Sequence, residues 1–122
     1  MKVLSLKQPY AELILSGKKT IEIRSWNTKF RGWFLIHASK TPDKNAMKSH
    51  GYEQLPVGVI VGKAELVGVK EYADQNEFEK DAGKHLATID YGRFGFLLDN
   101  PKRLPPVEAK GKLGFWEFEY QK

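Results

Sequence analysis

The order of apolar and polar residues along the chain predicts short strands and helices in irregular succession. Alternating apolar positions are typical of strands, whereas apolar residues spaced three and four apart are typical of one helix face. By these criteria strands are expected at Lys2–Leu6, Thr20–Arg24, Trp33–Ser39, Val57–Tyr72, Tyr91–Asp99 and 112–120. We expect the fifth strand to break at Asn100-Pro101, because proline cannot donate a hydrogen bond to a sheet.

Two helices are expected, at Gln8–Ser16 and Asp74–Ala87, and the mixed segment 40–56 has room for a third short one. Gly17 supplies a left-handed residue that ends the first helix. Two or three helices are too few to alternate regularly with the expected strands, as helices and strands do in a parallel sheet. The pattern therefore predicts an α+β fold: a small, mixed, partly closed β-barrel of five to six strands with two or three short helices.

The strand Thr20–Arg24 carries an unusual row of side chains. Alternation places Thr20, Glu22, Arg24 and then Trp26 on one face, with isoleucines on the other. A hydroxyl, a carboxylate, a guanidinium and an indole in one row suit one wall of a binding site. They also suit a solvated sheet face held by charge pairs. The pattern alone leaves both interpretations open.

Length and composition limit the class of protein. The 122 residues fit one domain over 1–122 and are enough to bury a core without disulfides. The chain has no cysteine, no apolar run near the roughly 20 residues of a membrane span, and no signal-peptide pattern at its start. We expect a cytoplasmic protein without a membrane partner.

The net charge of +5 is unevenly distributed. Residues 1–50 hold ten Lys or Arg against three acidic residues, whereas residues 51–122 hold ten against twelve. A basic excess in one half suggests a polyanionic partner, such as RNA or a nucleotide. Around Trp26, the basic loop extends through Arg31, and this mixture of aromatic and cationic residues is typical of single-stranded RNA binding.

Other candidate residues lie on the strand Trp33–Ser39. Trp33 is expected in the core, and His37 is expected to be a buried, hydrogen-bonded side chain. Ser39 and Lys40 follow at the end of this strand, where they suit the mouth of a cleft. The three histidines match no metal-ligand spacing, and no phosphate-binding glycine loop is present, so neither a metal nor a cofactor is expected.

The segment LSLKQPYAELILSGKKTIEIRSW resembles the opening of the ASCH family, whose hallmark is G-x-K-x-x-E-x-R. Gly17, Lys19, Glu22 and Arg24 meet this motif in full, and the segments 30–40 and 111–119 are also similar to the family pattern. The resemblance implies a PUA-like fold, with the motif residues at the floor of a cleft beside the barrel. It also implies binding of RNA or action on nucleotides.

Some small members of this family hydrolyse the acetyl amide of N4-acetylcytidine, and others are linked to RNA cleavage. In the amidohydrolases the motif lysine, a threonine and a distant glutamate are thought to carry catalysis. Here the position matching that threonine is Glu22, and the distant glutamate has four candidates: Glu65, Glu71, Glu77 and Glu79.

Three functional hypotheses follow. The first is an RNA- or nucleotide/nucleoside-binding domain that uses Lys19, Thr20, Glu22, Arg24, Trp26, Arg31, Ser39 and Lys40. The second is a hydrolase on the same cleft, either an N4-acylcytidine amidohydrolase or a ribonuclease, with Lys19 and Glu22 as catalytic residues. The third is a protein-interaction module that presents a basic face to an acidic partner. The oligomeric state stays open.

Overall fold

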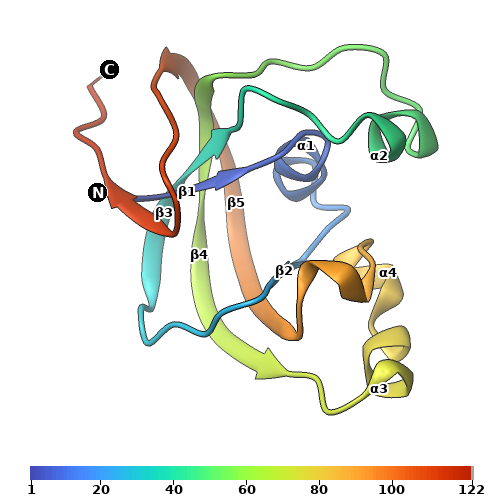
Figure 1. The fold of residues 1–122 in the computed structure, drawn as a ribbon. Coiled ribbons are helices and arrows are strands. Elements are labelled where there is room, and N and C mark those ends of the chain that lie inside the picture. The colour runs from blue at the N-terminus through green and yellow to red at the C-terminus, as the bar shows by residue number, and fades with distance from the viewer. Residues whose placement is uncertain (122) are drawn as a thin grey trace.

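The computed structural model describes residues 1–121 and shows an α+β fold, as expected. Within these residues the chain forms six strands, four short α-helices and one 3-10 turn (Figure 1). The strands are β1 (Lys2–Leu6), β2 (Ile21–Arg24), β3 (Gly32–Ala38), β4 (Val59–Glu71), β5 (Phe94–Glu108) and β6 (Phe115–Glu117). The helices are α1 (Tyr10–Leu15), α2 (Lys44–Ser49), α3 (Gln75–Lys80) and α4 (Ala82–His85), and the 3-10 turn is Ile89–Tyr91.

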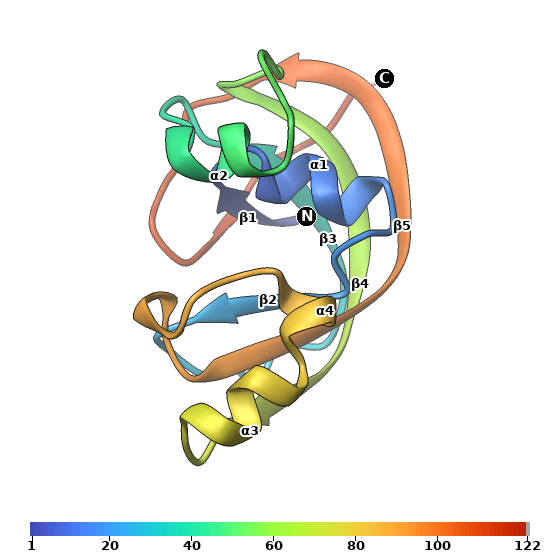
Figure 2. The ribbon, with the colours of Figure 1, turned by 90° about the vertical axis from the view of Figure 1, so that its right-hand side faces the viewer.

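All six strands belong to one mixed sheet of order β2-β5-β4-β3-β1-β6. β1 runs parallel to β3, and the other neighbouring pairs are antiparallel. β4 and β5 are long and strongly curved, and they arch along one side of the molecule, with α1, α2 and β1 near one end of the arch and β2, α3 and α4 near the other (Figure 2). Among the described residues, the edge strands β2 and β6 form no ladder with each other, so the curled sheet stays open.

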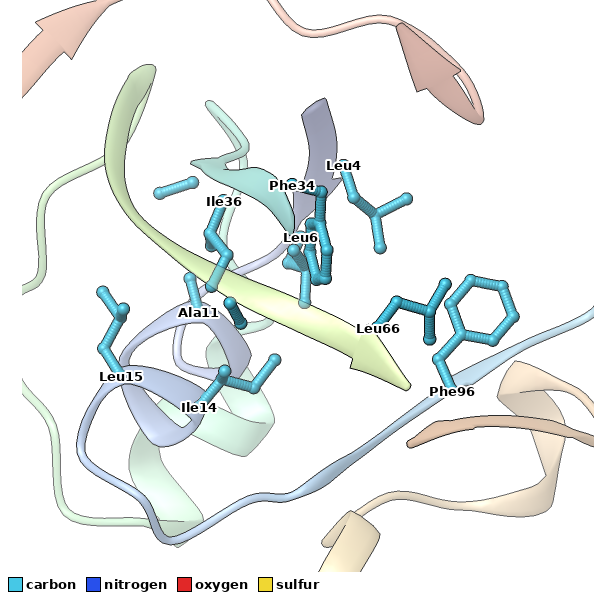
Figure 3. Close-up of a cluster of buried hydrophobic side chains, with 11 residues drawn as sticks. Leu4, Leu6, Ala11, Ile14, Leu15, Phe34, Ile36, Leu66 and Phe96 are labelled. Atoms are coloured by element: carbon cyan, nitrogen blue, oxygen red, sulfur yellow. The ribbon is translucent and has the colours of Figure 1, made fainter. Parts of the chain in front are cut away.

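The main core lies between α1 and one face of the sheet. Apolar side chains from α1 meet others from β1, β3, β4 and β5, and several of them interdigitate in Figure 3: Leu4, Leu6, Ala11, Ile14, Leu15, Phe34, Ile36, Leu66 and Phe96. Two smaller clusters complete the packing. Val3, Leu35, Ile60 and Trp116 are covered by the C-terminal segment, and Ile21 and Ile23 pack with Tyr72 and Phe78 near α3.

The predicted break at Asn100-Pro101 is wrong, because β5 continues to Glu108. Its pairing with β4 shifts register at three places, and two of these contain prolines: the first lies between Lys63 and Glu65, and the second lies between Ile60 and Gly62. Pro101 lies in the first irregular stretch, and Pro105 and Pro106 lie in the second. A bulge leaves residues out of the ladder, so these prolines interrupt no required hydrogen bond and the strand bends instead of ending.

Two further expectations differ from the structure. The expected helix Asp74–Ala87 is divided at Asp81 into α3 and α4, which raises the number of helices above two or three. Trp33 is not a core residue: its side chain is 37% exposed, and Lys63 Nζ lies 4.9 Å from the centre of its ring. The small core on this face of β3 includes Leu35 and the covering C-terminal aromatics, and Trp33 lies beyond it.

Gly62 permits a close approach of Leu15 on α1 to the β4–β5 pair. A β-carbon at this position would lie 2.4 Å from a methyl of Leu15 and 2.5 Å from the backbone oxygen of Lys102. Gly62→Ala is therefore expected to lower the free energy of unfolding by about 1–3 kcal/mol through overpacking, measured by urea denaturation. Gly68→Ala is the matched control, because its nearest neighbour is a Leu97 methyl at 3.3 Å. Equal stabilities of the two variants would contradict this account.

Candidate functional site

The site is a cleft of about 1530 Å³ beside the open edge of the sheet. Its floor and walls come from β2, from the ends of β1 and β3, and from the segment that joins β5 to β6. Among the described residues, its charged lining has six basic side chains and two acidic ones: Lys7, Lys19, Arg24, Lys40, Lys110 and Lys112 against Glu22 and Glu108. The cleft is thus suited electrostatically to an anion.

The turn after α1 places Lys19 under the cleft. Gly17 has φ +82°, and the Lys19 backbone amide donates to Leu13 O. The Lys19 ammonium then donates to the backbone oxygen of His85 and lies 3.3 Å from Glu22 Oε1. Only 1% of its side chain is exposed. Burial lowers the pKa of Lys19, although the negative charge of Glu22 opposes this effect.

Glu22 and Arg24 share one face of β2, while Ile21 and Ile23 on the other face anchor the strand in the core. Arg24 Nε lies 3.1 Å from Glu22 Oε2, so the carboxylate lies between two cations. Arg24 Nη2 also donates to Ser5 O at 2.7 Å, which links β2 to β1 across the open side of the sheet. With 22% of its side chain exposed against 10% for Glu22, Arg24 is the most accessible of the three.

The cleft brings together six of the eight predicted site residues. Lys19, Glu22, Arg24, Trp26, Ser39 and Lys40 line it, and Trp26 packs edge-on against Phe115 at 5.7 Å between ring centres. Thr20 lies outside the lining, and its backbone pairs with Lys84 and Leu98. Arg31 also lies outside, where Nη1 donates to the backbone oxygens of Thr28 and Phe30.

His37 is buried and hydrogen-bonded, as expected, and it forms part of the cleft wall. Its Nε2 donates to Ala109 O at 2.7 Å, because a carbonyl can only accept. Its Nδ1 therefore accepts from the Ser5 hydroxyl at 2.9 Å. Burial is the main cause that lowers the pKa of His37, which favours the neutral ring that this network requires.

Several residues that line the cleft were not among the site residues predicted from the sequence. Tyr10 begins α1, and its ring centre lies 5.1 Å from Lys19 Nζ and 5.6 Å from that of Tyr91. The Tyr91 hydroxyl donates to the carboxylate of Asp43, and this bond lowers the pKa of Asp43. The Gln8-Pro9-Tyr10 run was a usable signal for Tyr10. No local pattern marked Tyr91, because its place depends on the path of the chain after α4.

Glu108 is a further lining residue that the sequence did not single out. Within residues 1–121, none of the four downstream glutamates considered for catalysis lines the cleft. The same residues contain no group of three or more metal-ligating side chains and no helix long and apolar enough to span a membrane.

The Glu22 carboxylate offers a direct test of the charge cluster. Glu22→Ala leaves Lys19 buried without its counter-ion, so a loss of about 3–5 kcal/mol in unfolding free energy is expected. The double variant Lys19→Met/Glu22→Leu removes both charges and is expected to recover at least about half of that loss. Urea denaturation of the two variants measures the difference. If the double variant is as unstable as Glu22→Ala, the loss of the Lys19–Glu22 ion pair does not account for the lower unfolding free energy.

Comparison with known proteins supports the fold. Crystal structures of ASCH from Zymomonas mobilis are similar to the chain: the S128A mutant has a TM-score of 0.66 at 21% identity, and another ASCH structure from that organism has 0.64 at 22%. Both alignments cover 88% of this chain and 72% of the other, and at this identity they establish the fold alone. A search of curated proteins found no significant match. The sequence profile of the ASCH domain matches residues 4–110, and the chain therefore belongs to the ASCH domain family.

Proposed function

We propose that the cleft binds RNA, or a nucleotide or nucleoside, with the base and phosphate held between β2 and Lys40 at the rim. The observation that carries this proposal is the cluster of Lys19, Glu22 and Arg24 at the floor of a cleft whose lining is predominantly basic. Arg24 supplies a planar fork of donors for a phosphate or a base edge. Glu22 supplies an acceptor for a base amino group.

The fixed positions of these groups favour recognition. Glu22 is held by Lys19, and Arg24 is held by both Glu22 and Ser5 O, so neither side chain has to be ordered when a ligand binds. Trp26 adds an aromatic surface beside them. Lys40 at the rim is exposed and supplies attraction at longer range.

Binding of a labelled single-stranded RNA oligomer, followed by fluorescence anisotropy, tests the proposal. The affinity of the unmodified protein is expected to fall with salt, with a logarithmic slope of about −0.7 for each phosphate contacted. Arg24→Ala is expected to weaken binding about 10- to 100-fold, because it removes charge-assisted hydrogen bonds. Lys80→Ala, on α3 outside the cleft, is the control. A flat salt response with no effect of Arg24→Ala would exclude RNA binding by this cleft.

A second candidate function is amide hydrolysis of an N4-acylated cytidine in the same cleft. The buried Lys19–Glu22 pair favours it, because a carboxylate held in place beside an ammonium is suited to move a proton. Water would add to the acyl carbon, the bond from that carbon to N4 would break, and the proton taken from the water would pass to the departing amino group. Lys19 is covered, so Glu22 is the group that meets the substrate.

Incubation with N4-acetylcytidine tests this candidate through release of cytidine and acetate. Glu22→Gln keeps the shape of the side chain but removes the base, so turnover is expected to fall about 10²- to 10⁴-fold. Glu65→Gln, outside the cleft, is expected to match the unmodified protein. Equal turnover by the Glu22→Gln variant would exclude Glu22 as the base, and no turnover by the unmodified protein would exclude the activity.

A further inference from the structure

The segment 109–114, which joins β5 to β6, forms a second wall of the cleft that neither the motif nor the predicted site includes. In Figure 2 it descends on the side of the molecule opposite the β4–β5 arch. Lys110, Lys112 and Leu113 are all exposed, and Leu113 is 98% exposed. A single exposed apolar residue is common on protein surfaces. Leu113 is distinguished by its place directly after Lys112 in the lining of a basic cleft.

The backbone of this segment is held at both ends. Ala109 O accepts from His37 Nε2 at 2.7 Å, and the Ala109 amide donates to Gly58 O at 3.2 Å. At the other end Phe115 pairs with Leu4, and its ring packs against Trp26. The exposed side chains therefore project from a frame that is fixed before any ligand binds.

Gly111 fixes the middle of the segment. A β-carbon at this position would lie 2.9 Å from Ser5 Oγ and 2.9 Å from His37 Cε1. The Ser5 hydroxyl is itself held by His37 Nδ1 and accepts from Trp116 Nε1 at 3.1 Å. Any larger residue than glycine would have to lift the segment away from this network.

From these contacts we infer that the segment 109–114 binds the nucleotide next to the one on the cleft floor, so that the ligand is a single-stranded RNA chain. This inference rests on the proposed function and names its ligand class. Lys110 and Lys112 pair with phosphates, and Leu113 packs against the face of an unstacked base. The cleft volume of about 1530 Å³ exceeds the roughly 300–1,000 Å³ of small-molecule pockets, which favours a ligand longer than one nucleotide.

The test compares cytidine monophosphate with a single-stranded RNA oligomer, each titrated over a range of salt. The double variant Lys110→Ala/Lys112→Ala is expected to weaken oligomer binding and to reduce the logarithmic salt slope by about 1.4, the value for two phosphate contacts. Its affinity for the mononucleotide is expected to be unchanged. Leu113→Ala is expected to weaken oligomer binding several-fold with no change in slope, because it removes no charge. Lys80→Ala is the control for general loss of positive charge.

A further variant separates position from charge. Gly111→Val keeps every lysine but displaces the segment, so it is expected to weaken oligomer binding and leave mononucleotide binding unchanged. The inference is overturned if the unmodified protein binds the oligomer and the mononucleotide with equal affinity. It is also overturned if all three segment variants bind the oligomer as tightly as the unmodified protein does. Binding of polyglutamate in place of RNA, lost in the lysine double variant, would also overturn it in favour of an acidic protein partner. If the unmodified protein binds neither RNA nor mononucleotide, the proposed function fails as well.

Discussion

The carboxylate of Glu22 is the group on which the site depends. It lies within 3.3 Å of Lys19 Nζ and 3.1 Å of Arg24 Nε, and both cations are partly or wholly removed from water. Desolvation of charges is costly, and it is offset only when the ions are paired and their remaining hydrogen bonds are satisfied. Lys19 also donates to His85 O, and Arg24 Nη2 donates to Ser5 O. Arg24 Nε is buried without a hydrogen-bond partner among the described residues, so the ion pair with Glu22 is its main compensation. One carboxylate therefore connects α4, β2 and β1.

The cleft exists because the sheet does not close. β6 spans three residues and leaves β1 after Leu4, so the backbone oxygen of Ser5 faces the open side without a strand partner at that edge. An unpaired edge group of this kind is normally satisfied by another strand or by water. Here the guanidinium of Arg24 donates the hydrogen bond to Ser5 O in place of a strand or water. This contact holds β2 at a distance from β1 and keeps the space between them accessible.

The sequence predicted the parts of the site that depend on local geometry. Alternation along β2 placed Glu22 and Arg24 on one face, and the positive φ of Gly17 set the turn before them. Lys19 precedes the strand, so alternation did not indicate that it would be covered. The course of β5 beyond Pro101 and the segment 109–114 depend on bulges and on contacts more than 70 residues apart, such as that of His37 with Ala109. No local pattern contains such contacts.

The burial of Lys19 changes the physical meaning of the motif. Gly17 shapes the turn, the covered Lys19 neutralises Glu22, and Glu22 and Arg24 are the more exposed members of the cluster. Gly17 and Lys19, which are half of the motif, thus build the floor, and Glu22 and Arg24 are the motif residues that a ligand can reach. Under the proposed function, a floor of this kind would suit any ligand with a phosphate or an amino group, so selectivity would come from the surrounding walls. In this chain those walls are formed by Trp26, Lys40 and the segment 109–114, which lie outside the motif.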